Sequence, residues 1–389
     1  MTVPAGPDLT AEQSRAVRAA IGSARTIVVK VGSSSLTTSA GGLDPARLDA
    51  LVDALAARGA AGASIVLVSS GAIAAGLAPL GLKRRPRDLP TQQAAASVGQ
   101  QLLAQLYAGS FARHAVRVGQ VLLTSDDVVR RSHYRNAQRT FAKLLSLGVV
   151  PVVNENDTVA TAEIRFGDND RLAALVSHLV GADALVLLSD VDALYTGDPR
   201  LASSRRVDVV NGPADLADVE ISPSASDVST GGMSSKLSAA MMATGAGIPV
   251  LLASAAEAGS ALAARPALGT VFAPAVRRTS ARLFWLRHAA TSAGSLMLDD
   301  GAVAAVVGRR KSLLPAGITG ALGNFESGDV VDLLGPDGLT VARGFVGHDA
   351  ADLPGIIGRS LADLPPDLRH EVVHADDLIA VASAAGGLT

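Results

Sequence analysis

Two clusters of Asn and Asp residues stand on either side of a polar loop in the middle of the chain. The first, at residues 154–157, follows a short apolar run, and the second, at residues 167–170, precedes an apolar helical pattern. Ligands bind at strand ends in α/β proteins, so two such clusters at one crevice predict a site that holds polar groups. Helix capping is an alternative explanation for Asp168. Capping does not account for both clusters together.

Lysine is rare in this chain, because only five of the 34 basic residues are lysines. Lys30 lies inside the apolar run at residues 26–32, where its ammonium group must reach a partner or lose hydration free energy. The small residues that follow, beginning with Gly32 and Ser33, can turn backbone N–H groups toward a phosphate. A lysine that extends from the strand end into solvent is the alternative.

Lys236 stands in a second unusual setting, just after the sequence Thr-Gly-Gly-Met-Ser-Ser at residues 230–235. A helix is predicted from there to about residue 245, and the N–H groups and dipole at its start attract anions. A cation at that place needs a negative partner, so the segment predicts a phosphate contact, with a surface lysine as the alternative. The chain has neither a P-loop motif nor a G-x-G-x-x-G motif.

Ser70 and Gly71 follow the apolar run at residues 64–69. Glycine lets a backbone approach a ligand closely, and Ser70 offers a hydroxyl group. An ordinary strand-to-helix turn explains this pattern as well.

Buried strands that alternate with helices position all of these residues. Strands are expected at residues 26–32, 64–69, 116–123, 149–153 and 184–188, with helical patterns between them. This alternation predicts parallel βαβ units, and therefore an α/β fold with an open, mostly parallel sheet between helices. The site is expected at the carboxyl ends of the strands.

The C-terminal part differs, with short β segments separated by Gly- and Asp-rich turns. Strands are expected at residues 294–298, 302–307, 329–333 and 341–346, which predicts a small β-rich domain. The predicted divisions are an N-terminal extension (1–25), an α/β domain (26–274), a linker (275–289), the β domain (290–380) and a tail (381–389).

Composition excludes several classes of protein. The absence of cysteine excludes disulfides, thiolate metal sites and a cysteine nucleophile, and a reducing cytoplasm fits this composition. The net charge of −2 gives no electrostatic argument for a polyanionic partner. The N-terminus lacks the apolar run of a signal peptide, and no stretch of about 20 residues is apolar enough to span a membrane. A cytoplasmic protein without membrane contact is therefore expected.

Six short runs of the sequence together resemble the motifs of one known family. In chain order they are VVKVGSSSL, VSSGAIAAG, VGQVLLT, VVNENDTVATAEIRFGDND, SDVDALYTGDPR and TGGMSSK. With them the chain resembles the glutamate 5-kinases, a branch of the amino acid kinase family with a C-terminal PUA domain. The resemblance covers roughly residues 26–379. The NENDTVATAEI and GDND runs distinguish it from relatives that phosphorylate aspartate, N-acetylglutamate, carbamate or UMP. Ser34 stands where many members have Thr, and no chemical role is expected for residues 1–25.

The resemblance implies transfer of the ATP γ-phosphoryl group to the side-chain carboxylate of L-glutamate, which yields L-glutamyl 5-phosphate in the first step of proline synthesis. The implied catalytic residues are Lys30, Lys236, Asp168 and Asp170. The implied substrate-binding residues are Ser70, Gly71, Asn154, Asp157 and Asn169. The implied ATP-binding residues are Lys30, Gly32, Ser33, Ser189, Asp190, Thr230, Gly231, Gly232, Met233, Ser234, Ser235 and Lys236.

In this resemblance the two lysines clamp phosphate, and the acidic pair orients them and the ATP-bound magnesium. Asp157 is expected to face the α-ammonium group of the substrate. Mg²⁺ is expected mainly on ATP oxygens and waters, with few protein ligands. The family also implies inhibition by L-proline in the glutamate pocket, a dimer or tetramer, and functional coupling to glutamate-5-semialdehyde dehydrogenase.

Three alternatives remain open at this point. One is another carboxylate or carbamate kinase of the same fold. Another is an RNA-binding protein, since PUA domains often bind RNA. From residue 277 to the end the chain has ten Lys or Arg and thirteen Asp or Glu, and this net charge of −3 argues against RNA binding. Basic clusters at residues 277–278 and 309–311 nevertheless leave RNA binding open. The third is a catalytically dead proline sensor, which the intact lysines and aspartates disfavour.

Overall fold

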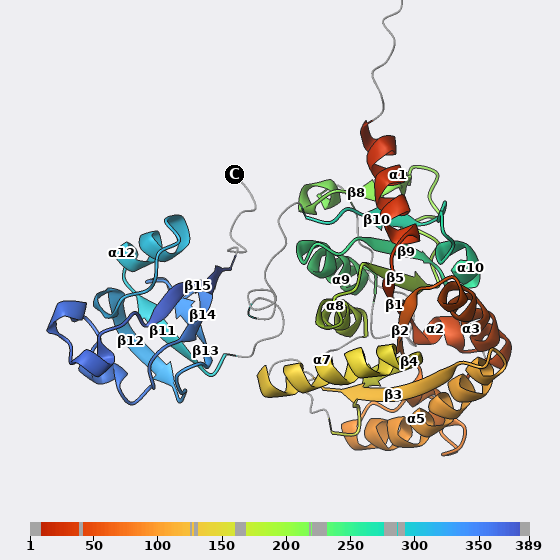
Figure 1. The fold of residues 1–389 in the computed structure, drawn as a ribbon, viewed down its shortest axis with the longest axis horizontal. Coiled ribbons are helices and arrows are strands. Elements are labelled where there is room, and N and C mark those ends of the chain that lie inside the picture. Colours follow the sequence, from red (N-terminus) through yellow and green to blue (C-terminus); the bar gives the residue numbers. More distant parts are fainter. Residues whose placement is uncertain are drawn as a thin grey trace, which may run out of the picture. The chain divides into compact units, whose positions relative to one another are not determined.

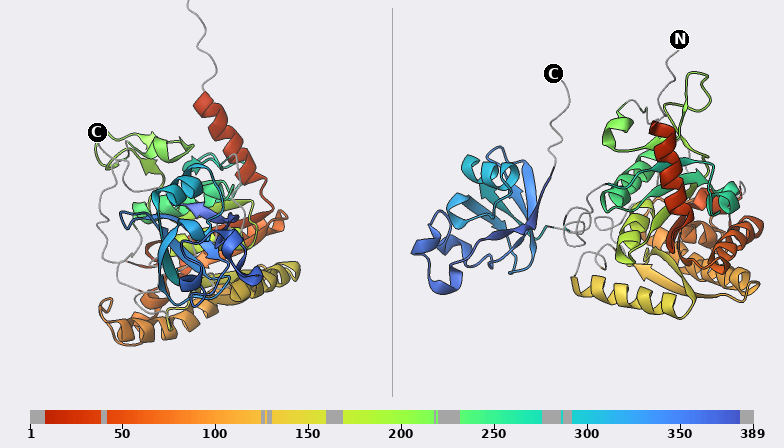
Figure 2. Two further views of the ribbon diagram at one scale, coloured as in Figure 1. Left: turned by 90° about the vertical axis from the view of Figure 1, so that its left-hand side faces the viewer. Right: turned by 45° about the horizontal axis from the view of Figure 1, so that its top comes forward.

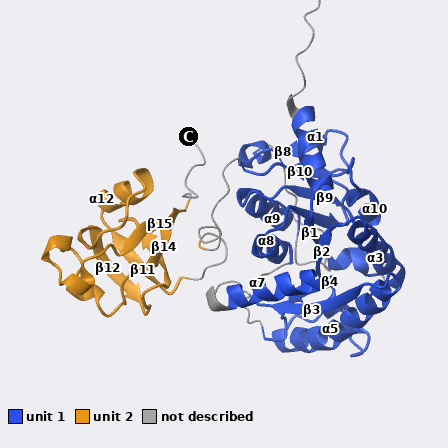
Figure 3. Ribbon diagram, in the orientation of Figure 1, with its two compact units in different colours: residues 1–278 blue, residues 279–389 orange. Residues whose placement is uncertain are grey.

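The computed structural model describes residues 9–38, 42–124, 127, 131–159, 169–217, 219, 232–275, 286 and 292–381. The chain divides into two compact units, residues 1–278 and residues 279–389 (Figure 3). The first is an α/β unit and the second is rich in β-strands, which confirms the predicted fold class. The predicted bounds of extension, linker and tail stay predictions.

An eight-stranded sheet forms the centre of the first unit (Figure 1). Its strands are β1 (Thr26–Val31), β2 (Ser64–Ser69), β3 (Arg117–Leu123), β4 (Val149–Glu155), β5 (Ala184–Ser189), β8 (Val209–Val210), β9 (Val250–Ser254) and β10 (Thr270–Phe272). Their spatial order is β3-β4-β2-β1-β5-β9-β10-β8. All neighbours pair in parallel except β9 and β10. The mostly parallel sheet therefore agrees with the prediction from alternating strands and helices.

Helices cover both faces of this sheet. In chain order they are α1 (Leu9–Gly22), α2 (Ser33–Leu36), α3 (Pro45–Ala60), α4 (Ala72–Leu77), α5 (Leu89–Ala112), α7 (Arg131–Ser146), α8 (Asn169–Leu179), α9 (Met233–Gly245) and α10 (Ala258–Ala261). In Figure 1, α8 and α9 lie on one side of the sheet, and α3 and α10 lie on the other. A short hairpin of β6 (Leu194–Tyr195) and β7 (Arg206–Val207) follows β5.

Side chains of β1 alternate between the two faces of the sheet. Ile27, Val29 and Val31 pack into the main apolar core, together with the buried leucines of α3. Because successive side chains of a strand point to opposite faces, Lys30 must face the other side, where α8 and α9 lie. The apolar pattern of the strand thus determines the direction of its one lysine.

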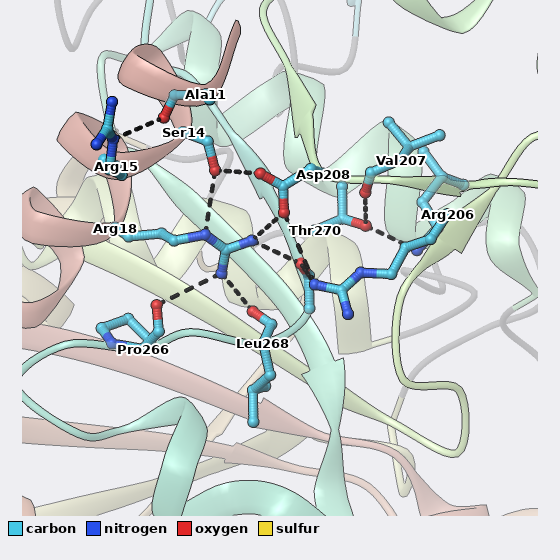
Figure 4. Close-up of polar contacts among 12 residues, drawn as sticks. Ala11, Ser14, Arg15, Arg18, Arg206, Val207, Asp208, Pro266, Leu268 and Thr270 are labelled. Carbon is cyan, nitrogen blue, oxygen red and sulfur yellow. Dashed lines mark hydrogen bonds and ion pairs between the residues drawn. The ribbon is translucent and has the colours of Figure 1, made fainter. Parts of the chain in front are cut away.

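Helix α1 belongs to the α/β unit, although it lies within the predicted extension. It lies against β8, β9 and β10 (Figures 1 and 2), and its Val17 and Ile21 side chains are buried in the core. Figure 4 shows the Arg18 guanidinium group between Ser14, Asp208 and the carbonyl groups at residues 266–268. Arg18 Nη2 lies 2.7 Å from an oxygen of Asp208 and donates to Gly269 O at 2.9 Å. A buried apolar face and a partly buried guanidinium group therefore attach α1 to the sheet.

The second unit contains a five-stranded sheet of its own. Its strands are β11 (Gly294–Leu298), β12 (Ile318–Gly323), β13 (Val330–Leu334), β14 (Thr340–Val346) and β15 (Val373–Ala380). Their order is β12-β11-β13-β14-β15, antiparallel except for β11 with β13. A separate apolar core, with Leu296, Val331 and Val373 among its fully buried residues, stabilises this unit.

The strand predicted at residues 302–307 was wrong. The structure has a short helix, α12 (Asp300–Val303), followed by a π-helical turn, η3 (Ala304–Gly308). The carboxylate of Asp299 accepts the N–H of Ala302 at 2.6 Å and so caps this helix. Ala302 and Val306 are the residues that reach the core, and their spacing of four places them on one helical face.

Among the helices that the structure describes, none is both long enough and apolar enough to cross a membrane.

Candidate active site

Four neighbouring parallel strands end at one edge of the sheet and carry the predicted site residues. Asn154 lies in β4, Ser70 follows β2, Lys30 lies in β1 and Ser189 ends β5. These strands are adjacent in the order β4-β2-β1-β5. The carboxyl edge of the sheet therefore brings together residues that lie up to 159 positions apart in the chain.

Asp170 joins the two lysines that the sequence singled out. Its Oδ1 lies 2.6 Å from Lys30 Nζ, and its Oδ2 lies 3.3 Å from Lys236 Nζ. Ser235 Oγ donates to the same Oδ2 at 2.9 Å. The Asp170 side chain is fully buried, and those of Lys30 and Lys236 are 6% and 10% exposed. The negative partner that each buried lysine requires is thus one shared carboxylate.

This carboxylate is ionised despite its burial. Burial alone would raise the pKa of Asp170, but the charges of Lys30 and Lys236 and the hydrogen bonds from Lys30 and Ser235 lower it below the usual value. The shared carboxylate holds two ammonium groups at the end of β1 and the start of α9, and cations in such a position suit a phosphate group.

Asn169, the residue before Asp170, faces the other two strands of the edge. Its Nδ2 donates to Ser70 Oγ and to Asn154 Oδ1, each at 2.8 Å, with a longer contact of 3.4 Å to Ser69 O. Its Oδ1 is buried and has no hydrogen-bond donor among the described residues. A buried acceptor without a donor is unusual, and a bound ligand or a water molecule would supply one.

The start of α8 therefore connects two chemically different halves of one site. Asn169 holds the polar half above β2 and β4, and Asp170 holds the cationic half beside β1 and α9. Neighbouring residues in one helical turn fix the distance between the halves. This arrangement suits a reaction in which a small polar molecule meets a phosphate.

Two glycines shape the turns around these halves. Gly71 precedes α4 with φ +112°, a left-handed conformation that glycine adopts without strain. Gly32 lies beside Lys30, because a Cβ added there would stand 3.8 Å from Lys30 Nζ. Small residues thus keep the backbone close to the reactive groups.

The predicted nucleotide segments lie beside the cationic half. Helix α9 begins after Gly232, which supplies no side-chain cap, and Met233 and Ser234 form its first turn with Ser235 and Lys236. Ser189 Oγ donates to Asp190 Oδ1 at 2.9 Å at the end of β5. Ser33 opens α2 directly after Gly32. The predicted residues Asp168, Thr230 and Gly231 lie outside the described residues.

Asp157 lines an open cleft of about 500 Å³. It is not among the partners of Asn169 described above, which are Ser69, Ser70 and Asn154. Gln100 of α5 and Asn156 line the same cleft. Gln100 also contacts Asn154, so the cleft adjoins the polar half of the site. The expected contact of Asp157 with a substrate ammonium group stays a prediction.

Comparison with known proteins identifies the family. The sequence profile of the amino acid kinase family matches residues 25–254, which is more than half of the chain. The chain belongs to the amino acid kinase family. A second profile, that of the PUA domain, matches residues 294–365 of this amino acid kinase. The resemblance inferred from the motifs is therefore confirmed, and the β-rich unit corresponds to the PUA domain.

Several relatives of this amino acid kinase match it over almost their whole length and are named glutamate 5-kinase. The relative from Rhodococcus opacus (strain B4) is 60% identical over 94% of this chain and 99% of its own. The relative from Streptomyces avermitilis is 62% identical over 94% of this chain and 98% of its own. The relative from Nocardia farcinica (strain IFM 10152) is 61% identical over 94% of this chain and all of its own.

Three residues that support the site of this amino acid kinase were not predicted from the sequence, namely Gln100, Tyr107 and Ser69. Gln100 Oε1 accepts a hydrogen bond from Asn154 Nδ2 at 2.7 Å. Tyr107 OH lies 2.8 Å from Ser69 Oγ, and both groups are buried. Gln100 and Tyr107 are seven positions apart and share one face of α5. That spacing was a usable signal, but the partners are 54 and 38 positions away in the chain.

Proposed function

We propose that this amino acid kinase transfers the γ-phosphoryl group of ATP to the side-chain carboxylate of L-glutamate, with L-glutamyl 5-phosphate and ADP as products. The observation that carries the proposal is the pair Asn169 and Asp170, which joins a polar pocket to two buried lysines. The names of relatives at 60–62% identity over nearly the whole chain support the choice of L-glutamate.

The proposed reaction needs cations more than it needs a base. A carboxylate oxygen forms a bond to the γ-phosphorus while the bond to the bridging oxygen breaks, and that electron pair leaves on ADP. Both reactants are anions, and two unit charges about 4 Å apart repel by about 4 kcal/mol at an effective dielectric constant near 20. The ammonium groups of Lys30 and Lys236 offset this repulsion and stabilise charge on the transferred oxygens.

In this proposal the nucleotide lies over β1, β5 and the start of α9. Its contacts are assigned to Lys30, Gly32, Ser33, Ser189, Asp190, Gly232, Met233, Ser234, Ser235 and Lys236, with Thr230 and Gly231 as further predictions. L-Glutamate is assigned to Ser70, Gly71, Asn154, Asp157 and Asn169. Asp170 orients the two lysines, and the same role for Asp168 stays a prediction.

Magnesium is part of the proposal only as an ion carried by ATP. Within the described ranges, no three or more His, Cys, Asp or Glu side chains group together in a way that would hold a metal ion. Asp170, the buried acid of the site, is already bound by two lysines and a serine. Mg²⁺ binds few protein ligands when it accompanies phosphates, so its charge would add to that of the lysines.

The pathway and its regulation are finer parts of the same proposal. The product would enter proline synthesis, and L-proline would inhibit by competing for the polar half of the site. A dimer or tetramer, functional coupling to glutamate-5-semialdehyde dehydrogenase and a cytoplasmic location stay predictions from the family.

RNA is a poor partner for the β-rich unit on electrostatic grounds. Its described residues 292–381 contain six Lys or Arg and thirteen Asp or Glu, a balance of −7. The count from residue 277 gave −3 because it also included four arginines. These four arginines lie before β11, the first strand of the unit. Phosphate contacts dominate nucleic-acid affinity, so this charge disfavours binding.

The experiment that tests the proposal is ATP- and Mg²⁺-dependent hydroxamate formation with hydroxylamine. L-Glutamate, L-aspartate and N-acetyl-L-glutamate are compared as acceptors for the wild type and for Lys30→Met and Lys236→Met. Lys143→Met, on the exposed surface of α7, is the matched control. We expect product only from L-glutamate, a fall of about 100-fold or more in kcat for the two site variants, and no change in the control.

Product from another acid but not from L-glutamate would overturn the substrate assignment. No product from any acid would overturn the kinase activity itself and favour a binding protein.

A further inference from the structure

A chain of three side-chain amides runs from α5 into the polar half of the site. It begins at Gln100, passes through Asn154 and ends at Asn169, with contacts of 2.7 and 2.8 Å. Each amide has one accepting oxygen and one donating nitrogen, so the orientation of one amide dictates that of the next.

A backbone group sets the orientation of the middle amide. The N–H of Glu155 donates to Asn154 Oδ1 at 2.9 Å, and a backbone N–H can only donate. Asn154 Oδ1 is therefore the accepting side, and Asn154 Nδ2 must point away from it. That nitrogen donates to Gln100 Oε1, and both residues are buried.

The orientation of Asn169 follows from that of Asn154. Because Asn154 Oδ1 accepts, Asn169 must present its nitrogen, and the same nitrogen donates to Ser70 Oγ. Asn169 Oδ1 is left as the buried atom without a donor among the described residues. If the Asn154 amide were reversed, two donors would meet and Asn169 would present its nitrogen elsewhere.

Helix α5 holds the first amide firmly against the site. Gly99, beside Gln100, packs so closely that an added Cβ would stand 1.8 Å from Ala72 O. One face of the same helix carries Tyr107, whose hydroxyl contacts Ser69 at 2.8 Å. The position of α5, and with it that of Gln100, is therefore fixed at two places, one on α4 and one on β2.

We propose that Gln100 is a positioning residue: together with the Glu155 N–H it holds the Asn154 amide, and so keeps Asn169 Oδ1 directed toward the substrate, where it accepts a hydrogen bond from the substrate's α-ammonium group. This inference rests on the proposed glutamate kinase activity and adds a residue to it. Gln100 does not touch the reacting atoms; it acts through Asn154.

The test compares Gln100→Met, which has similar length and no acceptor, with Gln100→Glu, which keeps an acceptor. The matched control is Gln101→Met, because Gln101 lines the same cleft and is exposed. KM for L-glutamate, KM for ATP and kcat are measured at one pH, with the thermal midpoint of each variant.

We expect Gln100→Met to raise KM for L-glutamate by about tenfold, the effect of one misplaced hydrogen bond, while KM for ATP stays within about twofold. Gln100→Glu should restore most of the glutamate affinity, and Gln101→Met should resemble the wild type. Glutarate, which lacks the ammonium group, should inhibit the wild type and Gln100→Met with equal inhibition constants. If Gln100→Met does not fold, Gln100→Asn withdraws the acceptor while remaining polar and carries the same expectation.

An unchanged KM for L-glutamate, an equal rise in both KM values, or no rescue by Gln100→Glu would overturn the role of Gln100. Weaker glutarate inhibition of Gln100→Met would also overturn it, since the ammonium group would then be uninvolved. Failure of the wild type to phosphorylate L-glutamate would instead refute the proposed function, before any variant is compared.

Discussion

Asp170 is a single buried carboxylate shared by two buried ammonium groups. Removal of one partner from such a cluster is costly, because the remaining charges stay buried without compensation. The same carboxylate keeps both lysines at the edge of the sheet. Asp170 is therefore expected to matter for stability and, under the proposed function, for catalysis.

Asp170→Asn should reveal this dependence in urea unfolding at pH 7. The substitution keeps the shape but leaves Lys30 and Lys236 with like charges and no shared anion, so we expect a loss of about 3–5 kcal/mol. Asp198→Asn is the control, because Asp198 forms an exposed ion pair with Arg200. Equal unfolding midpoints for both variants would contradict the shared-carboxylate account.

The pH dependence of stability provides a second test at this scale. The pKa of Asp170 is lowered in the folded protein, so its ionised form stabilises the fold above the ordinary value of 3.8. This contribution is lost as pH falls from that value through the lower folded-state pKa. The stability difference between wild type and Asp170→Asn should therefore shrink below about pH 4. A constant difference between pH 7 and pH 3 would show that Asp170 is not the group responsible.

At the scale of elements, the close packing of α4 on α5 positions both Ser70 and Gln100. Gly99→Ala would place a Cβ 1.8 Å from Ala72 O and force the helices apart. We expect a loss of about 1–3 kcal/mol and a higher KM for L-glutamate. Gly109→Ala on the same helix meets no atom within 4 Å and should instead stabilise by about 0.5–1 kcal/mol. Thermal unfolding of the two variants measures both effects, and a stable Gly99→Ala would refute the close packing.

Helix α1 offers another test at the element scale. Arg18→Met removes the hydrogen bonds to Asp208 and to the carbonyl groups before β10, and we expect a loss of about 1–3 kcal/mol with kcat unchanged. Arg15→Met is the matched control, because Arg15 is exposed and its bond among the described residues is to Ala11 O of its own helix (Figure 4). Chemical unfolding measures the difference. Equal midpoints would show that α1 is held by its apolar face alone.

The sequence allowed some of these elements and residues to be predicted and not others. Lys30 and Lys236 stood out because lysine is scarce here and each lies in an apolar or glycine-rich setting. The strand pattern predicted the sheet and its functional edge. Gln100 shares one helical face with Tyr107, but that spacing does not reveal its partner, which is 54 positions away in the chain. The segment 302–307 was misread because a cap by Asp299 determined its helical form and its apolar residues fit either structure.

At the scale of the whole molecule, the two units have separate apolar cores. The described contacts of the candidate site, from Lys30 to Lys236, lie within residues 1–278. A fragment of residues 1–278 should therefore fold and retain hydroxamate formation with a KM for L-glutamate close to that of the full chain. The same fragment with Lys236→Met is the negative control. A folded but inactive fragment would mean that the β-rich unit takes part in catalysis.

The central claim is that a carboxylate oxygen of the acceptor attacks the γ-phosphorus beside Asp170 and its two lysines. L-Glutamate labelled with ¹⁸O in both side-chain carboxylate oxygens tests it directly, with unlabelled ATP and hydroxylamine as trap. Hydroxylamine attacks the carbonyl carbon of the acyl phosphate and releases phosphate together with the former bridging oxygen. We predict one ¹⁸O atom in each released phosphate, detected by ³¹P NMR, and almost no phosphate from Lys236→Met. Phosphate without ¹⁸O would show that water is the acceptor and would contradict the account.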